Sequence, residues 1–137
     1  MFASFSFGSD PFSDCNGCDP FPQSVLLVTA PLSFNCNIKF VRIEEGITEI
    51  AVAAFKSIDS FSVVELPTTL KKIGSNAFNG CFKLKYINFP DGLEYIGESA
   101  FGITSIKELY LPDSLTEIED FTFSNNDSLE FVYIPGS

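Results

Sequence analysis

The feature that most constrains this chain is an internal repeat of roughly 22 residues. Proline recurs at almost equal intervals, at Pro67, Pro90, Pro112 and Pro135. Apolar residues return at fixed offsets after each proline; after Pro67 they are Leu70, Ile73, Ala77, Phe78, Leu84, Ile87 and Phe89. One residue is missing between Phe101 and Ile106, yet the pattern stays in register across the gap. Such self-similarity is the signature of a stacked repeat architecture.

The repeat predicts a solenoid. Each unit carries a single apolar stripe that it cannot bury alone, so neighbouring units have to stack. Residues 63–66, 86–89, 108–111 and 131–134 alternate in side-chain direction, as strands do, and stacking would join them in a parallel sheet. The proline that follows each run has no N–H for a ladder and suits a strand end. Strands of a sandwich are the alternative, but they would not need Ala-Phe at one fixed offset.

The phenylalanines occupy one repeated position. The chain of 137 residues contains 16 Phe, and four of them, Phe55, Phe78, Phe101 and Phe123, fall at the same place in successive units. We expect these four rings to stack as a buried spine on the convex side. The stretch around Phe78, residues 74–80, is too short for a stable α-helix, and a single helical or 3₁₀ turn is expected there.

Several units are similar to a known repeat family. Residues 84–90 (Leu-Lys-Tyr-Ile-Asn-Phe-Pro) and 93–101 (Leu-Glu-Tyr-Ile-Gly-Glu-Ser-Ala-Phe) resemble the BspA-like (Treponema pallidum type) leucine-rich repeats. The resemblance covers about residues 38–137, and Cys81, three residues past Phe78, also matches; Ile58 and Asn126 occupy its position in other units. It implies a mainly β leucine-rich-repeat solenoid, with a short parallel sheet on the concave face and short turns or helical turns on the convex side.

The two ends of the chain differ from the repeats. Residues 1–23 lack periodicity and are expected to be irregular or weakly ordered, whereas residues 24–137 are assigned to the solenoid, with about four full rungs from residue 44 and a degenerate first rung. The sequence given stops just after a strand, so Leu129, Val132 and Ile134 are expected at an open rung end. Two alternatives follow: a fragment of a longer array, or an end that another chain covers by end-to-end association.

Strand alternation predicts a candidate binding surface. If Val64, Ile87, Leu109 and Val132 point inward, their neighbours face outward on the concave side of the sheet. Solenoids bind on such surfaces, and Tyr and Arg are favoured interface anchors. The alternative is that the aromatic side chains pack sideways on their neighbours. The partner-binding residues expected on this surface, hereafter the strand face, are Phe40, Arg42, Glu65, Tyr86, Asn88, Glu108, Tyr110, Phe131 and Tyr133.

Composition excludes several classes of function. The net charge is −10 with only eight Lys and Arg, whereas nucleic-acid binding needs clustered basic residues, so neither nucleic acid nor an anionic membrane is an expected partner. The aliphatic run 25–28 is too short to span a bilayer, and no signal peptide is recognisable. The chain has no His and none of the common nucleophile or phosphate-binding motifs. No enzyme activity, catalytic residue, cofactor or metal is therefore expected.

Three smaller features leave alternatives open. Cys15 and Cys18 have the spacing of a zinc or redox motif, but the further zinc ligands and the βαβ context that such motifs need are missing. Together with Cys36 they are either free thiols or, in a secreted protein, part of a disulfide. Cys81 is expected to be a small buried apolar residue. An acidic loop could hold Ca²⁺ but is better explained as solvated; it contains Asp10, Asp14, Asn16 and Asp19. Residues 126–128 form a glycosylation sequon, which matters only in a secreted protein.

The expected function is non-enzymatic protein binding through the strand face. The family resemblance implies a surface protein that adheres to a host or extracellular-matrix protein, at the cell surface or secreted. An intracellular scaffold or adaptor is the alternative. The sequence alone does not define the compartment.

Overall fold

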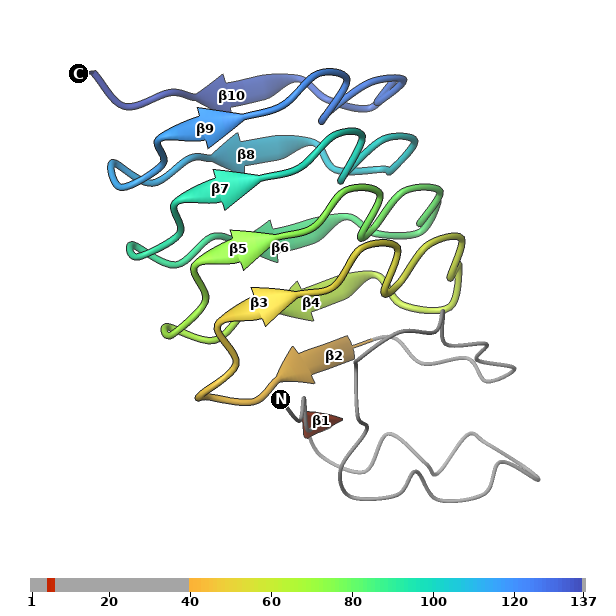
Figure 1. Cartoon of the computed structure of the whole chain (residues 1–137). Helices are drawn as coiled ribbons and strands as arrows, with labels where there is room; N and C mark the ends of the chain where they lie inside the picture. Colours follow the sequence, from red (N-terminus) through yellow and green to blue (C-terminus); the bar gives the residue numbers. More distant parts are fainter. Residues whose placement is uncertain (1–4, 7–39, 137) are drawn as a thin grey trace.

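The computed structural model describes residues 5–6 and 40–136, with side chains from residue 41 onward. These residues form a ladder of stacked rungs (Figure 1). Each rung has one longer strand on the face called the front below, which is the far side in Figure 1. Every described rung but the last also has a two-residue strand on the opposite face, called the back. The expectation of a mainly β solenoid of stacked rungs is confirmed. The strands are β1 (Phe5–Ser6), β2 (Phe40–Ile43), β3 (Glu49–Ile50), β4 (Val63–Glu65), β5 (Lys72–Ile73), β6 (Tyr86–Asn88), β7 (Tyr95–Ile96), β8 (Glu108–Tyr110), β9 (Glu117–Ile118) and β10 (Phe131–Tyr133).

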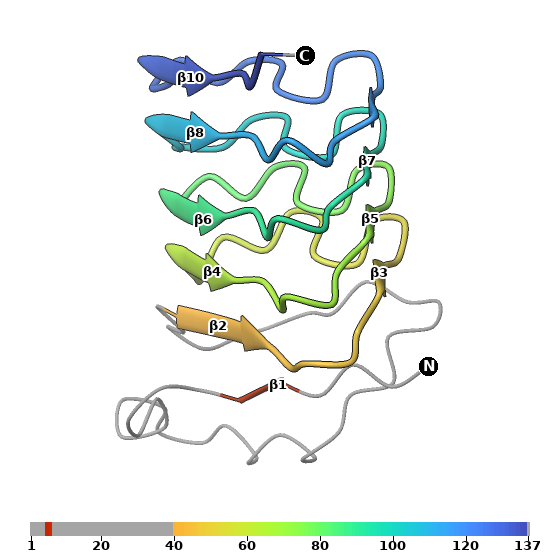
Figure 2. The same cartoon turned by 90° about the vertical axis from the view of Figure 1, so that its left-hand side faces the viewer.

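The front strands follow the predicted alternation. Strands β2, β4 and β6 pair in parallel, with Val41, Val64 and Ile87 in register, and β8 pairs in parallel with β10 (Figure 2). The short β1 pairs antiparallel with β2. Val64 and Leu109 are each 1% exposed. The sheet is not continuous, however, because β6 and β8 are not paired in the described part of the chain.

A second sheet, which the sequence did not predict, lines the back. Strands β3, β5, β7 and β9 pair in parallel, and Ile50, Ile73, Ile96 and Ile118 lie in register. The first three of these isoleucines are at most 1% exposed. Their spacing in the sequence is the same as that of the front strands, but each back strand is only two residues long. So short a run carries no visible alternation.

A helical or 3₁₀ turn was expected around Phe78, but this segment and its equivalents in the described rungs contain turns and no α- or 3₁₀-helix. Their N–H groups are divided between two directions. Phe78 N donates to Ala100 O in the next rung (2.8 Å), whereas Asn79 N donates to Asn76 O within its own turn (3.1 Å). A helix would keep all of these bonds within one segment. Two residues in each turn take positive φ angles, as Asn76 (58°) and Gly80 (75°) do, and this prevents a helix from propagating.

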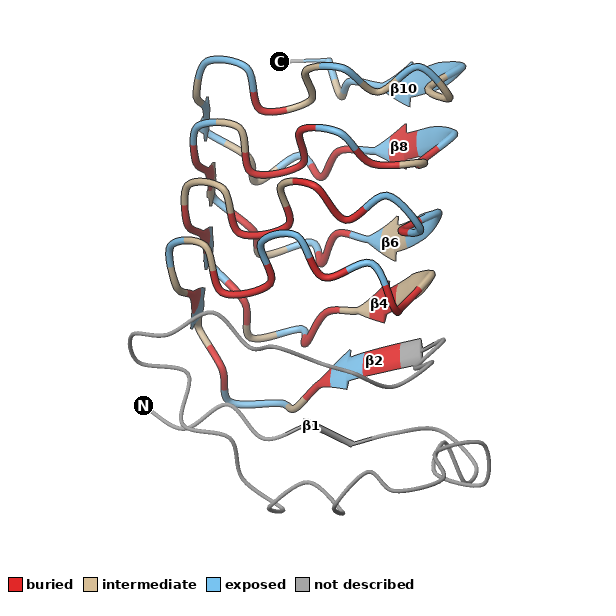
Figure 3. Cartoon of the chain, turned by 90° about the vertical axis from the view of Figure 1, so that its right-hand side faces the viewer, coloured by how far each residue is buried: buried red, intermediate tan, exposed pale blue. Residues whose placement is uncertain are grey.

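The phenylalanine spine is present at the centre of the core. Phe55, Phe78 and Phe101 are fully buried, and consecutive rings are stacked with centroids 5.0 and 5.2 Å apart. Phe123 continues the stack at 5.8 Å but is only partly buried. Figure 3 shows the buried interior running from rung to rung and fading at the last one. The expectation of a buried spine is therefore confirmed for three of its four rings.

Glycine allows the rungs to approach each other closely after the back strand. A Cβ on Gly74 would lie 2.7 Å from Val52 N, and a Cβ on Gly97 would lie 2.6 Å from Ser75 N. Gly74 N and Gly97 N each donate to an isoleucine carbonyl of the preceding rung at 2.9 Å. At these two positions a side chain would meet the backbone of the preceding rung. In the last back strand the equivalent residue is Glu119, whose N–H makes the same bond, to Ile96 O at 3.0 Å.

The last described rung is open on its outer side. Val132 is 37% exposed and Ile134 72% exposed, so these two residues, predicted to point inward, are not covered (Figure 3). Ile118 and Phe121 of the preceding segment are exposed as well. Most of residues 1–39 lies outside the described residues, so the proposed boundary at residue 23 and the degenerate first rung stay predictions.

Replacement of a spine ring should unfold much of the stack. We expect Phe78→Ala to lower the free energy of unfolding by about 3–5 kcal/mol, because it removes two stacking contacts and leaves a cavity in a fully buried site. Urea denaturation followed by circular dichroism measures the change. Phe82→Ala in the same rung is the matched control, since Phe82 is 58% exposed. Equal losses in the two variants would contradict the assignment of the spine as the core.

Relief of backbone strain at Ile103 should stabilise the fold. Ile103 takes a φ of 57°, a conformation that is costly for a β-branched residue, and the equivalent residues are Ser57, Gly80 and Asn125. We expect Ile103→Asn to raise the free energy of unfolding by about 1 kcal/mol, because Asn tolerates this conformation. Thermal denaturation checks the change. Ile103→Val keeps the strain and should give no gain; a gain in that variant would refute the explanation.

Candidate functional site

The structure places the predicted strand-face residues together on the front of the solenoid. Tyr86 and Asn88 of β6, Glu108 and Tyr110 of β8, and Phe131 and Tyr133 of β10 are exposed, and so is Arg42 of β2. Glu65 of β4 is partly exposed. Phe40 lies in register with Val63, but its side chain is outside the described residues. The surface is thus assembled as expected, while its role in binding stays a prediction.

Tyr110 is the centre of an aromatic cluster on this face. Its ring centroid lies 5.7 Å from that of Phe131 and 6.5 Å from that of Tyr133. Its hydroxyl donates a hydrogen bond to Glu108 Oε2 at 3.2 Å, and this bond, with the nearby negative charge, raises the pKa of Tyr110. The sideways packing considered from the sequence is therefore present here. It leaves Tyr110 59% and Tyr133 50% exposed, so the cluster still offers a large aromatic surface.

Tyr86 stands apart from that cluster. Its side chain is 65% exposed, and within the described part of the chain it makes no ring contact. Exposed tyrosines of this kind combine a large apolar surface with a polar tip and few rotatable bonds, which is why they recur at protein interfaces. Neither the core nor a neighbouring ring explains the position of Tyr86.

Two ion pairs cross between rungs on the front. Arg42 Nε lies 2.7 Å from Glu65 Oε2, and Lys107 Nζ lies 3.6 Å from Glu130 Oε1. All four side chains are between 42% and 73% exposed, so these pairs add little to stability. Their charges remain at the surface, where a partner can compete for them.

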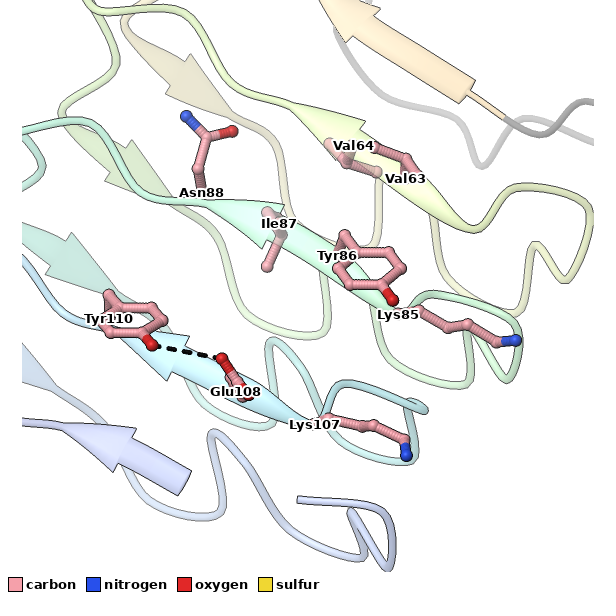
Figure 4. A pocket seen from close by; sticks show the side chains of 9 residues that line it. All are labelled: Val63, Val64, Lys85, Tyr86, Ile87, Asn88, Lys107, Glu108 and Tyr110. Atoms are coloured by element: carbon pink, nitrogen blue, oxygen red, sulfur yellow. Dashed lines mark hydrogen bonds between the residues drawn. The ribbon is translucent and has the colours of Figure 1, made fainter. Parts of the chain in front are cut away.

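A shallow hollow of about 370 Å³ lies between β6 and β8 (Figure 4). Tyr86, Asn88, Glu108 and Tyr110 line it, as the sequence pattern suggested. The partner-binding set predicted from the sequence did not include the remaining lining residues. Val63 was expected to face outward but was not counted as a binding residue, Val64 and Ile87 were assigned to the interior, and the two lysines lie outside the predicted strands. Lys85 and Lys107 occupy equivalent positions just before their strands, which was a usable signal. The missed residues are Val63, Val64, Lys85, Ile87 and Lys107.

Cys81 is a core residue. It is fully buried, and its Sγ donates to Phe55 O at 3.1 Å. Burial, with a smaller contribution from Asp59, raises the pKa of the Cys81 thiol to about 12. A thiol that stays protonated and inaccessible is neither a nucleophile nor a metal ligand. The prediction that Cys81 is a buried small residue is confirmed.

Asn126 is structural in this fold. Its Nδ2 donates to Phe101 O (2.8 Å) and Phe123 O (2.9 Å), while its Oδ1 accepts from Thr104 N and Thr104 Oγ1. One amide hydrogen therefore joins two rungs and the other bonds within the turn of Asn126 itself, and a glycan on Nδ2 would remove one of the two. The sequon at residues 126–128 is better explained by this bonding than by glycosylation.

The remaining candidates lie outside the described residues. These are Cys15, Cys18 and Cys36, and the acidic loop with Asp10, Asp14, Asn16 and Asp19. Within residues 40–136, no group of three or more metal-binding side chains comes together. Nor does that part of the chain contain a helix of the length and apolarity needed to cross a membrane.

A stacked rung with a front strand, a buried aromatic spine and an open strand face defines a leucine-rich-repeat protein, a class whose fold generally serves as a non-enzymatic binding scaffold. The family described as BspA type Leucine rich repeat region matches residues 33–137, with six copies of the repeat. The chain belongs to this family, and the resemblance noted in the sequence is confirmed. The family indicates a protein-interaction module.

Solved leucine-rich repeat proteins share the fold. The chain is similar to one from Bacteroides ovatus (34% identity, TM-score 0.68, 72% of this chain and 26% of the other). It is also similar to one from Bacteroides capillosus (32% identity, TM-score 0.58, 66% of this chain and 64% of the other). A third is the Treponema pallidum protein TpLRR (26% identity, TM-score 0.51, 72% of this chain and 65% of the other). The chain thus spans about a quarter of the first protein and just under two thirds of the other two. No curated protein matches the chain.

Proposed function

We propose that this chain is a non-enzymatic module that binds another protein through the strand face. The observation that carries the proposal is the row of exposed aromatic side chains on three successive front strands. The exposed fractions of these side chains lie between 48% and 65%, so none of them belongs to the buried core; they are Tyr86, Tyr110, Phe131 and Tyr133. Large aromatic side chains on one face of a solenoid supply the contact area on which protein interfaces depend.

The site of binding is proposed to be the full set predicted from the sequence. Of its charged members, Arg42 and Glu65 pair with each other and Glu108 accepts from Tyr110, and such exposed charges would orient a partner more than hold it. The net charge of −10 favours a partner that is basic overall. The set comprises Phe40, Arg42, Glu65, Tyr86, Asn88, Glu108, Tyr110, Phe131 and Tyr133.

The biological setting is proposed to be adhesion or recognition at a cell surface, with a host or extracellular-matrix protein as partner. This proposal rests on the family. An intracellular scaffold using the same face is the second candidate. Labelling of intact cells with a non-permeant reagent separates the two, because only a surface protein would be labelled.

Removal of the exposed tyrosines should abolish binding without unfolding the chain. We expect the triple variant Tyr86→Ala, Tyr110→Ala, Tyr133→Ala to lose at least tenfold in affinity for a partner captured with the native chain, because a single tyrosine anchor can contribute about 2 kcal/mol to an interface. Isothermal titration calorimetry measures the affinity, and circular dichroism checks the fold. The matched control is Phe82→Ala, which removes an exposed aromatic side chain away from the strand face. Unchanged affinity in the folded triple variant would defeat the proposal.

We further propose that the 137-residue chain associates through its last described rung. Val132 and Ile134 are exposed there, and β10 has one unpaired edge in the described residues. Exposed strand edges flanked by apolar side chains tend to pair with other chains. Sedimentation velocity should show concentration-dependent association, and Ile134→Lys should weaken it. A monomer at all concentrations would contradict this expectation.

A further inference from the structure

The front sheet is interrupted where the repeat is one residue short. Val63 pairs with Tyr86, and Glu108 pairs with Phe131, across units of equal length; Tyr86 and Glu108 are one residue closer in the sequence, and their strands are not paired. The shorter turn ends at Ser105, whose N–H donates to Leu84 O at 2.9 Å and whose hydroxyl donates to Phe82 O. These two bonds tie the turn to the rung below just before β8 begins. The break thus coincides with the missing residue.

The interruption exposes a residue that other rungs bury. Val64, Ile87 and Leu109 hold equivalent positions in β4, β6 and β8, and Val64 and Leu109 are each 1% exposed. Ile87 is only partly buried and lines the hollow between β6 and β8. Tyr86 and Tyr110 flank it from the two strands (Figure 4). The gap in the sheet is therefore an apolar depression between two tyrosines.

Two lysines mark one end of this depression. Lys85 precedes β6 and Lys107 precedes β8, and both belong to the lining of the hollow (Figure 4). The chain carries 18 acidic and eight basic residues, so a pair of lysines beside an apolar depression runs against its overall charge. Glu130 lies 3.6 Å from Lys107 with both side chains well exposed, a weak pair that a ligand carboxylate can replace.

We propose that the hollow between β6 and β8 binds an extended segment of the partner protein in which an apolar side chain lies next to a carboxylate. The apolar side chain would sit over Ile87 between the two tyrosines, and the carboxylate would pair with Lys85 and Lys107. A volume of about 370 Å³ is at the small end of ligand pockets and suits one large side chain. The inference rests on the proposed function, because it names the partner chemistry of one part of the strand face.

The lining favours a peptide over a sugar. A sugar needs a hydrogen-bond partner for most of its hydroxyl groups, and leaving buried polar groups without partners is costly. Apart from the two lysines and the two tyrosine hydroxyls, the polar side chains of the lining are Asn88 and Glu108, and Glu108 already accepts from Tyr110. Val63 and Ile87, both partly exposed, supply an aliphatic floor that an apolar side chain covers without such a cost.

The test uses a displayed library of random heptapeptides, selected on the immobilised native chain. Enriched peptides should combine an aromatic or large aliphatic residue with Asp or Glu within two positions. One enriched peptide, synthesised and labelled, should bind the chain at least tenfold more tightly than it binds the double variant Lys85→Glu, Lys107→Glu. The control variant Lys56→Glu, Lys72→Glu makes the same charge change at exposed sites away from the hollow, and it should bind as the native chain does.

Several results would overturn the inference. They are a lack of enrichment, enriched peptides without acidic residues, or equal losses in the hollow and control variants. Binding of glycans in place of peptides, tested on a glycan array, would also overturn it. If Arg42→Ala and Glu65→Ala weaken peptide binding while the lysine variant does not, the strand face binds but the hollow does not. Loss of binding in none of these variants would count against the proposed function itself.

A second variant tests the origin of the hollow. A glycine inserted between Thr104 and Ser105 restores the length of the neighbouring units. It should allow β6 and β8 to pair, slow hydrogen exchange at the amides of Ile87 and Tyr110, and lower the affinity for the enriched peptide at least tenfold. A folded insertion variant with unchanged exchange and unchanged affinity would show that the missing residue does not create the site. If the insertion prevents folding, the lysine variants decide the inference by themselves.

Discussion

The stacking of one rung on the next is the interaction on which everything else in this chain depends. No single rung has enough apolar surface to fold alone, so the rings of Phe55, Phe78 and Phe101 are buried only because they lie against each other. The backbone follows the same rule. In each convex turn, some N–H groups bond within the turn and others bond to the next rung, as Asn79 N and Phe78 N do. A rung without a neighbour would therefore lose both its core and much of its turn bonding.

The dependence of each rung on its neighbours explains where the structure accommodates a rung that is one residue short. The missing residue between Phe101 and Ile106 interrupts neither the spine nor the back sheet: Phe123 still stacks on Phe101, with centroids 5.8 Å apart, and β7 still pairs with β9. Both elements carry the buried contacts, so a displacement there would be costly. The outward-facing side chains of the front strands make fewer buried contacts. The misfit is accommodated on the front, between β6 and β8, where it opens a surface at little cost to the core.

Much of this architecture could be predicted from the sequence, because repetition repeats the same physical demand. The Phe position, the Ala-Phe pair and the outward direction of Tyr86 and Tyr110 all follow from offsets that recur. The second sheet could not be predicted, since two-residue strands show no alternation. The positive φ angles of Ala53, Ser99 and Phe121 were invisible for a related reason: such different residues share one backbone position, so composition gives no signal. The partial exposure of Phe123 and Ile87 depends on neighbouring rungs, which a periodicity does not describe.

The separation of roles within each rung bears on how such a chain can acquire a ligand. Cys81, Asn126 and Thr69 all face the neighbouring rung and donate to its carbonyl groups, so replacing any of them with a residue that has no donor removes a bond between rungs. The strand-face side chains have no such obligation, because the ladder beneath them is made by backbone atoms. Residues as different as Val63, Tyr86, Glu108 and Phe131 therefore occupy one position in successive strands. The fold fixes where this surface lies and leaves its chemistry free to vary from rung to rung, so its specificity has to reside in these few outward side chains.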